Sequence, residues 1–251
     1  MSERKVALVI DGMTALGTAI CQRLRRDGLV VAASYPVHQR NPEAWLAAQR
    51  DEGGTFSAWC LDAGELDDCA GLMGKLLAAH GRLDVLVNLA GEPGDGQLPG
   101  AGLGQLAPAA WDAAMQLVHG AFNMNKQALP PMLEQRWGRI IQVAAAPAAP
   151  AQGRRLAASH AAANAALHGL TRALALETAR CGVTVNTVMP GYLRQSAQAG
   201  PGDDAQIAAQ IPVGRLGEPD EVAALVSYLA SESAAFVTGA QIAINGGQHM
   251  A

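Results

Sequence analysis

The sequence predicts an α/β fold in which seven parallel strands form one doubly wound sheet, and a single domain spans residues 1–251. Short apolar runs rich in β-branched residues alternate with longer segments of helical periodicity. Glycine separates a helical segment from the next strand at Gly28, Gly81 and Gly182, where helices commonly end. The chain has no internal repeat and no linker that would divide it into domains.

The first apolar run follows a charged N-terminal stretch and reads as a buried strand. Later runs of the same kind place the strands at residues 6–10, 29–33, 55–60, 85–88, 139–143, 183–188 and 241–244. Helical patterns fill the intervals at residues 16–27, 42–51, 65–80, 109–135, 156–180 and 218–231. This alternation is typical of a parallel sheet that is covered on both faces.

Composition narrows the classes of function. The chain is 50% hydrophobic and 16% charged, which suits a large buried core. Its net charge is −4, and no cationic run exceeds the pairs at 25–26 and 154–155, so we expect no nucleic-acid partner. The run at 6–10 is too short for a signal peptide, and no later run resembles a membrane span. We therefore expect a cytoplasmic protein with no membrane partner.

The four cysteines show neither a CxxC spacing nor a cluster with histidine. This pattern predicts buried, reduced thiols and no metal site. Two segments that follow predicted strands are unusual in composition: 91–104 is rich in glycine and proline, and 144–153 is nearly all alanine and proline. Ligands of open α/β sheets bind at such strand ends, but these segments offer few reactive side chains.

Several stretches in the right order and spacing resemble the short-chain dehydrogenase/reductase family, whose fold is Rossmann-like. They are VNLAG at 87–91, GRI at 138–140, VN at 185–186, PG at 190–191 and NGG at 245–247. Four further stretches are similar to the acetoacetyl-CoA reductases within that family: GTAICQRL at 17–24, WGRI at 137–140, GVTVNTV at 182–188 and NGGQHM at 245–250. The resemblance covers nearly the whole chain.

In this family a Thr-Gly-x-x-x-Gly-x-Gly loop lets the backbone approach the pyrophosphate of a dinucleotide. Residues 10–17 of this chain read IDGMTALG, so Asp11 and Ala15 replace the first two glycines and only Gly17 remains. A carboxylate ~4 Å from a phosphate costs about 1 kcal/mol in water, and about 4 kcal/mol at an effective dielectric constant of roughly 20. The substitutions predict a degenerate loop that binds no dinucleotide.

The positions that would contact the ribose and the adenine also match the family pattern poorly. No acid follows the second predicted strand until Glu43, and Arg40 suits either a 2′-phosphate contact or an exposed loop. The resemblance assigns Asp62 to an adenine contact, although an aspartate there equally suits a turn or a helix cap. Asp62 and Asn88 are therefore vestigial cofactor positions in this reading.

The family's catalytic positions have lost their chemistry. Its active-site helix carries Tyr-x-x-x-Lys, in which the tyrosine donates a proton and the lysine lowers the tyrosine pKa and holds the nicotinamide ribose. Here those positions are His160 and Asn164, and the active-site serine falls on Ala145. The resemblance also places the family's helix asparagine at Leu117 or Val118, and a nicotinamide-contacting threonine at Gln195.

Loss of chemistry on an intact scaffold predicts a catalytically inactive subunit of a hetero-oligomeric 3-hydroxyacyl-CoA dehydrogenase. We expect no cofactor and no metal in this chain. NAD is expected in the partner, a homologous active subunit within a heterotetramer. The resemblance places the contacts on helices 109–135 and 156–180, with Trp111, Leu117 and Phe122 as apolar contacts, although the alanines of the second helix equally suit burial within the chain's own domain.

Two alternatives remain. The first is an independent reductase with a rewired site, because a histidine such as His160 can donate or accept a proton near neutral pH without a lysine. A regulatory protein that senses a nucleotide or another ligand in the old crevice is the other.

Overall fold

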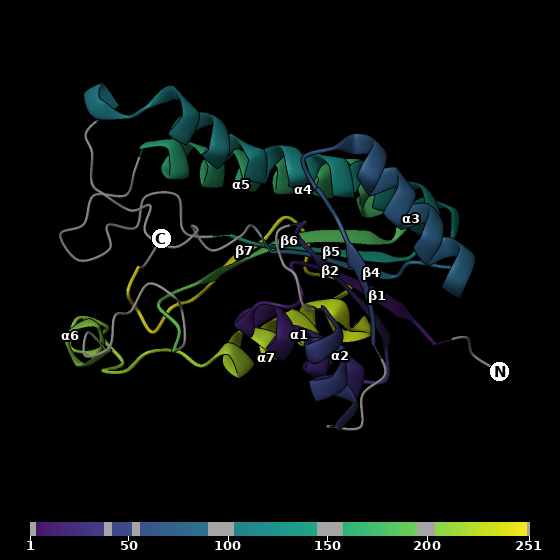
Figure 1. Cartoon of the computed structure of the whole chain (residues 1–251), viewed down its shortest axis with the longest axis horizontal. Helices are drawn as coiled ribbons and strands as arrows, with labels where there is room; N and C mark the ends of the chain where they lie inside the picture. Colours follow the sequence, from purple (N-terminus) through teal and green to yellow (C-terminus); the bar gives the residue numbers. More distant parts are fainter. Residues whose placement is uncertain are drawn as a thin grey trace.

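Seven parallel strands form one sheet in the order β3-β2-β1-β4-β5-β6-β7, which confirms the predicted fold class (Figure 1). The computed structural model describes residues 4–37, 42–51, 56–89, 103–144, 158–194 and 204–249. The strands are β1 (Val6–Ile10), β2 (Val30–Tyr35), β3 (Phe56–Cys60), β4 (Val85–Leu89), β5 (Gly138–Val143), β6 (Val183–Pro190) and β7 (Gln241–Ile244). Each begins within one residue of its predicted start.

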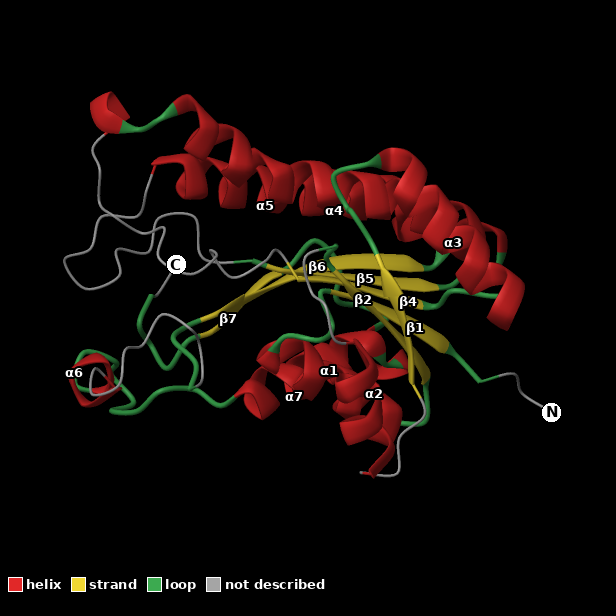
Figure 2. Cartoon of the chain, in the orientation of Figure 1, coloured by secondary structure: helices red, strands yellow, loops and turns green. Residues whose placement is uncertain are grey.

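Helices cover both faces of the sheet: α3, α4 and α5 lie on one face, and α1, α2 and α7 lie on the other (Figure 2). The α-helices are α1 (Ala15–Arg26), α2 (Pro42–Asp51), α3 (Leu66–His80), α4 (Pro108–Glu134), α5 (Ala158–Thr178), α6 (Asp204–Ala208) and α7 (Pro219–Ala230). Three 3₁₀ turns are η1 (Leu103–Gln105), η2 (Ala179–Cys181) and η3 (Glu232–Ala234). The short elements η1, α6 and η3 were not predicted, because they are too short to show a hydrophobic period.

Strand β1 shows why the sheet needs two helical layers. All five of its residues are buried, and successive side chains point to opposite faces. Leu8 belongs to one hydrophobic cluster with Met124 of α4, whereas Val9 belongs to another with Ile20 of α1 and Val226 of α7. The continuous apolar run in the sequence is therefore explained by burial on both faces.

The three glycines predicted to end helices all adopt left-handed backbone conformations. The φ angles are 93° at Gly28, 75° at Gly81 and 78° at Gly182. At Gly182 a Cβ atom would also lie 2.3 Å from the carbonyl oxygen of Arg136, so both the backbone angle and the available space require glycine. The predicted helix stops are confirmed at these positions.

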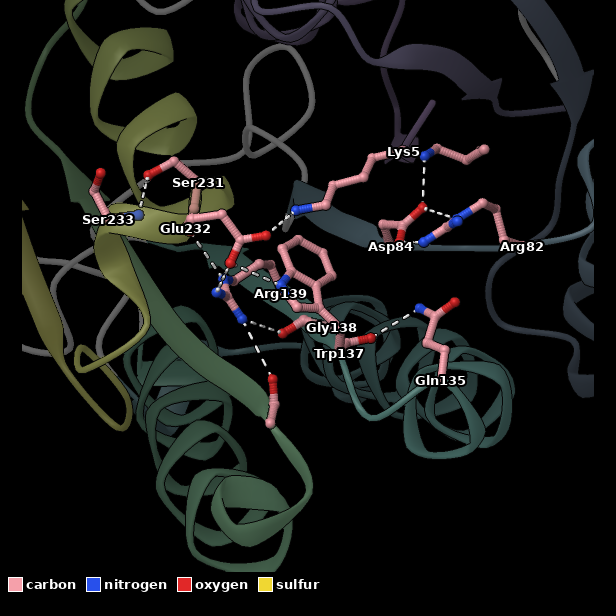
Figure 3. A network of polar contacts seen from close by, with 12 residues as sticks. Lys5, Arg82, Asp84, Gln135, Trp137, Gly138, Arg139, Ser231, Glu232 and Ser233 are labelled. Carbon is pink, nitrogen blue, oxygen red and sulfur yellow. Dashed lines mark hydrogen bonds and ion pairs between the residues drawn. The ribbon is translucent and has the colours of Figure 1, made fainter. Parts of the chain in front are cut away.

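A polar network closes the amino-terminal edge of the sheet, where Trp137 precedes β5 and Lys5 precedes β1 (Figure 3). The Arg139 guanidinium carbon lies 4.3 Å from the centroid of the Trp137 ring, and the Lys5 ammonium lies 3.7 Å from it. The Trp137 indole donates to Glu232 Oε2 at 3.1 Å, and Glu232 also pairs with Lys5. These contacts join β1 and β5 to the turn η3 near the C-terminus.

Arg139 is the largest buried side chain of this network, at 2% exposure. Its guanidinium donates to three backbone carbonyl oxygens, those of Ser231 at 3.2 Å, Gly138 at 3.1 Å and Gly182 at 3.3 Å. Burial lowers the pKa of Arg139 from its ordinary value, whereas the nearby Glu232 carboxylate opposes that shift. The buried cation is stabilised by oxygen acceptors and by the face of Trp137.

Candidate functional site

The order of the strands places the candidate site at the carboxyl ends of β1 and β4. The sheet is extended in opposite directions on either side of this pair, and ligands of open α/β sheets bind at such a switch point. In the register of the two strands, Ile10 lies opposite Asn88. The degenerate loop therefore begins beside Asn88, while Ala90 and Gly91 lie outside the described residues.

Asp11 occupies the first glycine position of the loop and adopts φ 54°, a left-handed conformation. Aspartate is among the few residues that tolerate this region. The backbone N–H of Asp11 donates to Ser34 Oγ at 3.1 Å, and its carbonyl oxygen accepts from the Thr14 hydroxyl at 3.0 Å. The loop thus keeps a glycine-like backbone while a carboxylate stands where the family has no side chain.

Gly17 is the one family glycine of this loop that remains, and the structure requires it. A Cβ atom at Gly17 would lie 2.5 Å from the carbonyl oxygen of Asp11. The N–H of Gly17 donates to the hydroxyl of Thr14, the residue that caps helix α1, at 3.1 Å. The loop therefore packs closely against the first turn of α1, and glycine is required at this contact.

Ala15, at the second glycine position, lines a shallow pocket of about 630 Å³ between the beginnings of α1 and α7. The charged residues around it are Arg215, Glu218, Asp220 and Glu221. The guanidinium of Arg215 pairs with Glu221 at 2.7 Å, and that hydrogen bond is the main reason the pKa of Glu221 falls to about 2. Glu218 is paired in turn with Arg194 at 2.6 Å, so the three acids of the pocket exceed the two arginines by one charge, which disfavours a phosphate.

Asp62 behaves as a turn residue after β3. Its side chain is exposed, and its Oδ1 atom accepts from the backbone N–H of Gly64 at 3.0 Å. The side-chain amide of Asn123 in α4 holds the same turn by donating to the carbonyl oxygens of Ala63 and Gly64, both at 3.0 Å. The local-structure explanation accounts for Asp62 without a ligand. Arg40 lies outside the described residues.

Asn88 points into the protein interior. It is 3% exposed, and its amide donates to Asn125 Oδ1 on α4 at 2.9 Å. The Nε2 atom of Gln142 on β5 donates to the same oxygen at 3.1 Å. Asn125 and Gln142 were not predicted from the sequence; the available signal was a polar residue inside an otherwise apolar helix face and strand.

His160 and Asn164 lie one turn apart on α5. Asn164 is 6% exposed, and its side-chain amide donates to the backbone carbonyl oxygen of His160 at 2.9 Å. His160 is half-buried, and its Nδ1 atom is buried without a hydrogen bond from the described residues. Burial lowers the pKa of His160 from its ordinary value of 6.5, so the imidazole is neutral at pH 7.

The remaining catalytic positions divide into two groups. Ala145 and Gln195 lie outside the described residues. Leu117 and Val118, the two candidates for the helix asparagine, are described: both are half-buried on α4, and Val118 packs against Ala144 and Leu167. An apolar contact therefore occupies this part of α4, whichever of the two positions corresponds to the asparagine.

Within the described ranges, no group of three or more His, Cys, Asp or Glu side chains is arranged to hold a metal ion. Cys21 and Cys69 are buried as predicted, and desolvation raises the pKa of Cys69 to about 11. Cys60 is exposed at the end of β3 and Cys181 is only half-buried, so the prediction of four buried thiols is wrong at these two positions. None of the helices in the described part of the chain is both long and apolar enough to cross a membrane.

Comparison with known proteins extends the likeness over nearly the full chain. Residues 12–249 match the family described as enoyl-(acyl carrier protein) reductase. The chain is 38% identical over 247 residues to nodulation protein G of Azospirillum brasilense, covering 97% of this chain and 98% of that protein. It is 37% identical over 250 residues to acetoacetyl-CoA reductase of Cupriavidus necator, covering 98% and 99%.

A solved structure agrees in fold over the same extent. A mutant of a Serratia marcescens short-chain dehydrogenase/reductase superposes with a TM-score of 0.85 at 30% identity, and the match covers 99% of both chains. The family match, the relatives and the fold all lead to one assignment. This chain belongs to the short-chain dehydrogenase/reductase family.

Proposed function

We propose that this chain is a non-catalytic subunit of a hetero-oligomeric dehydrogenase that interconverts a 3-hydroxyacyl-CoA and a 3-oxoacyl-CoA. The partner, a homologous subunit with an intact Tyr-x-x-x-Lys, binds NAD and carries out the reaction in the cytoplasm. The observation that carries the proposal is on α5, where the amide of Asn164 is bonded to the carbonyl oxygen of His160 in its own helix.

Proton transfer is the first function that these residues serve poorly. A ketone becomes an alcohol when its carbon receives a hydride and its oxygen receives a proton. The family places a tyrosine near this oxygen and a lysine beside it. His160 is neutral at pH 7, and Asn164 brings no positive charge, so neither residue supplies the acid and cation pair.

Dinucleotide binding is the second function that these residues serve poorly. A dinucleotide would need its pyrophosphate close to the loop at Asp11, whose carboxylate opposes it, and to the start of α1, where Glu218 and Asp220 line the adjoining pocket. Tyr35, at the end of β2, offers no carboxylate for the ribose hydroxyls. The described residues fit this cofactor badly, and we assign NAD to the partner subunit alone.

The substrate class rests on the relatives. Several proteins similar to this chain over nearly their full length are acetoacetyl-CoA reductases, which supports a 3-oxoacyl thioester as substrate of the complex. The selective loss of site residues also resembles the inactive subunit of the heterotetrameric 2-(α-hydroxybenzyl)succinyl-CoA dehydrogenase of anaerobic toluene breakdown. We propose that relationship as the specific form of the assignment.

The outer face of α4 supports a subunit contact. Trp111, Phe122 and Leu133 are 39%, 49% and 38% exposed and recur every eleven residues, which is about three helical turns, so they form one stripe. Leu117 was predicted to belong to this face but is half-buried. Ala165 and Leu176 are exposed on the neighbouring helix α5. Apolar side chains in a row on a helix surface are typical of an interface.

The test is co-expression of the tagged chain with a homologue that has an intact Tyr-x-x-x-Lys, followed by native mass measurement. We expect a stable hetero-oligomer that oxidises or reduces an acyl-CoA. Phe122→Asp should dissociate it, whereas Val37→Asp should not; Val37 is an exposed apolar residue between β2 and α2, and α2 lies on the opposite face of the sheet from α4. A homotetramer of this chain that turns over acyl-CoA would support the rewired reductase. Ligand-dependent association with an unrelated protein would support the sensor.

A further inference from the structure

A cluster of three side-chain amides lies inside the protein between the sheet and α4. Asn88 on β4, Gln142 on β5 and Asn125 on α4 are 3%, 0% and 2% exposed. Asn125 Oδ1 accepts from Asn88 Nδ2 at 2.9 Å and from Gln142 Nε2 at 3.1 Å, so the three carboxamides converge on one atom. Leu86 and Ile140, two residues earlier on the same strands, belong to the hydrophobic cluster that contains Met124. The three amides thus form a buried polar cluster at the edge of an apolar core.

Each amide keeps one buried polar atom that has no hydrogen-bond partner among the described residues: Asn88 Oδ1, Gln142 Oε1 and Asn125 Nδ2. Buried polar groups in folded proteins are nearly always paired with protein or with ordered water, because an unpaired one retains its full desolvation cost. Three such atoms on mutually bonded side chains, two of them acceptors and one a donor, need a small partner that both donates and accepts.

We propose that this cluster binds one internal water molecule. The water accepts from Asn125 Nδ2 and donates its two hydrogens to Asn88 Oδ1 and Gln142 Oε1, which matches every unpaired atom of the three amides. If all three amides are turned by 180°, the unpaired set becomes two donors and one acceptor. Water matches that set as well, because it accepts two hydrogen bonds and donates two. A cation would be repelled by the N–H group of one amide, and an anion would be repelled by the carbonyl oxygens of the others.

The water has a structural role that follows from its neighbours. Asn88 and Gln142 each lie one residue before the end of their strands, and the two residues are paired in the β4–β5 register. The segments that follow these strands contain Gly91 and Ala145, which lie outside the described residues. A water shared by the three amides fixes both strand ends to α4, whether or not the chain binds a dinucleotide.

The direct test is a crystal structure of the unmodified protein at atomic resolution. We expect one fully occupied water at about 2.7–3.2 Å from the amide of Asn125 and from the amide oxygen or nitrogen of Asn88 and of Gln142. Amides that pair only with protein atoms, with no water among them, would overturn the proposal. This measurement needs no variant and is decided by the native chain alone.

A second measurement uses magnetisation transfer from long-lived water to side-chain amide protons in solution. The native protein should show transfer to the Asn125 amide. Gln142→Leu should reduce it at least twofold, because the water loses one of its partners. The matched control is Asn123→Leu, two residues earlier on the same helix, where the amide is bonded to the turn after β3. The control should keep the full signal; equal signals in Gln142→Leu and the native chain would contradict the proposal.

Discussion

The side-chain amide of Asn164 donates to the backbone carbonyl oxygen of His160, 2.9 Å away and one turn earlier on α5. The resemblance assigns these two residues to the positions of the family's proton donor and its cation. The bond commits the amide of Asn164 to its own helix, and burial keeps the imidazole of His160 neutral. Under the proposed assignment the two substitutions act together: the helix is maintained, and its acid–base pair is lost.

Restoring these two residues alone is not expected to restore activity. In the double variant His160→Tyr/Asn164→Lys, the carboxylate of Asp11 and the methyl group of Ala145 still occupy the phosphate loop and the serine position. Turnover of acetoacetyl-CoA with NADH or NADPH should stay at background. Measurable turnover in the double variant would show that the other losses matter less than we argue.

The backbone at Asp11 gives a prediction for stability. Because φ is 54°, a β-branched residue is strained there, and Asp11→Val should lower the free energy of unfolding by about 1–2 kcal/mol. Asp11→Asn, which tolerates the same conformation, is the matched control and should change it by less than about 0.5 kcal/mol. Urea unfolding followed by circular dichroism measures both. Equal stability of the two variants would argue against the left-handed conformation.

Gly17→Ala tests the contact between the loop and α1. The added Cβ would lie 2.5 Å from the carbonyl oxygen of Asp11, which is backbone and cannot simply rotate away. We expect a loss of about 1–3 kcal/mol in thermal or urea unfolding. Gly74→Ala in α3, where no atom of the described residues lies within 4 Å of the added Cβ, should be neutral or stabilising. The reverse order of the two variants would contradict the packing described here.

The pKa of His160 predicts part of the pH dependence of stability. Burial lowers this pKa in the folded chain, whereas in the unfolded chain it keeps its ordinary value of 6.5. As the pH falls below 6.5, His160 becomes protonated in the unfolded chain while it stays neutral in the folded chain. Protonation therefore stabilises the unfolded chain, and the free energy of unfolding decreases until the pH passes the folded pKa of His160. Well above pH 6.5 His160 is neutral in both the folded and the unfolded chain, so it contributes no pH dependence there.

Replacement by glutamine removes that contribution. The unfolding free energy of His160→Gln should therefore decrease less than that of the native chain between about pH 7.5 and about pH 5. The other titratable groups are common to both proteins, so the difference between the two slopes isolates His160. A variant that loses more stability than the native chain on acidification would mean that the folded pKa is raised.

Arg139 is expected to be essential to the fold and unimportant to any chemistry. Its removal in Arg139→Leu leaves three backbone carbonyl oxygens without their donor, and we expect a loss of about 3–5 kcal/mol. Arg139→Lys should recover only part of the lost stability, because a lysine ammonium cannot replace the planar guanidinium group that stacks on the Trp137 ring. Chemical unfolding of the two variants, compared with the native chain, checks the order.

The strands and long helices were predictable because they depend on regular patterns. Val6–Ile10 and Gln241–Ile244 match their predicted bounds, as does Pro42–Asp51. The helix predicted to reach residue 180 ends as α-helix at Thr178 and continues as η2, since helix ends often tighten into 3₁₀ turns. Strand β6 runs two residues past its prediction, to Pro190, because its end pairs with β7.

The candidate site was less accessible to sequence reasoning. The motifs predict which family residues are missing, as at His160 and Asn164, and this assignment stays a prediction. The direction of the Asn164 amide, the left-handed angle at Asp11 and the convergence of Asn88 and Gln142 on Asn125 were not predicted. The amide cluster in particular joins elements far apart in the chain, and such a relationship arises only when strands and helices pack together.

Equilibrium titration of NADH and NADPH into the chain purified alone tests the central claim most directly. We expect no binding at micromolar concentrations, and one dinucleotide for each Tyr-x-x-x-Lys subunit when the same titration is made on the co-expressed complex. Saturable micromolar binding to the isolated chain, lost in Gly17→Ala at the first turn of α1, would contradict the assignment of the cofactor to the partner.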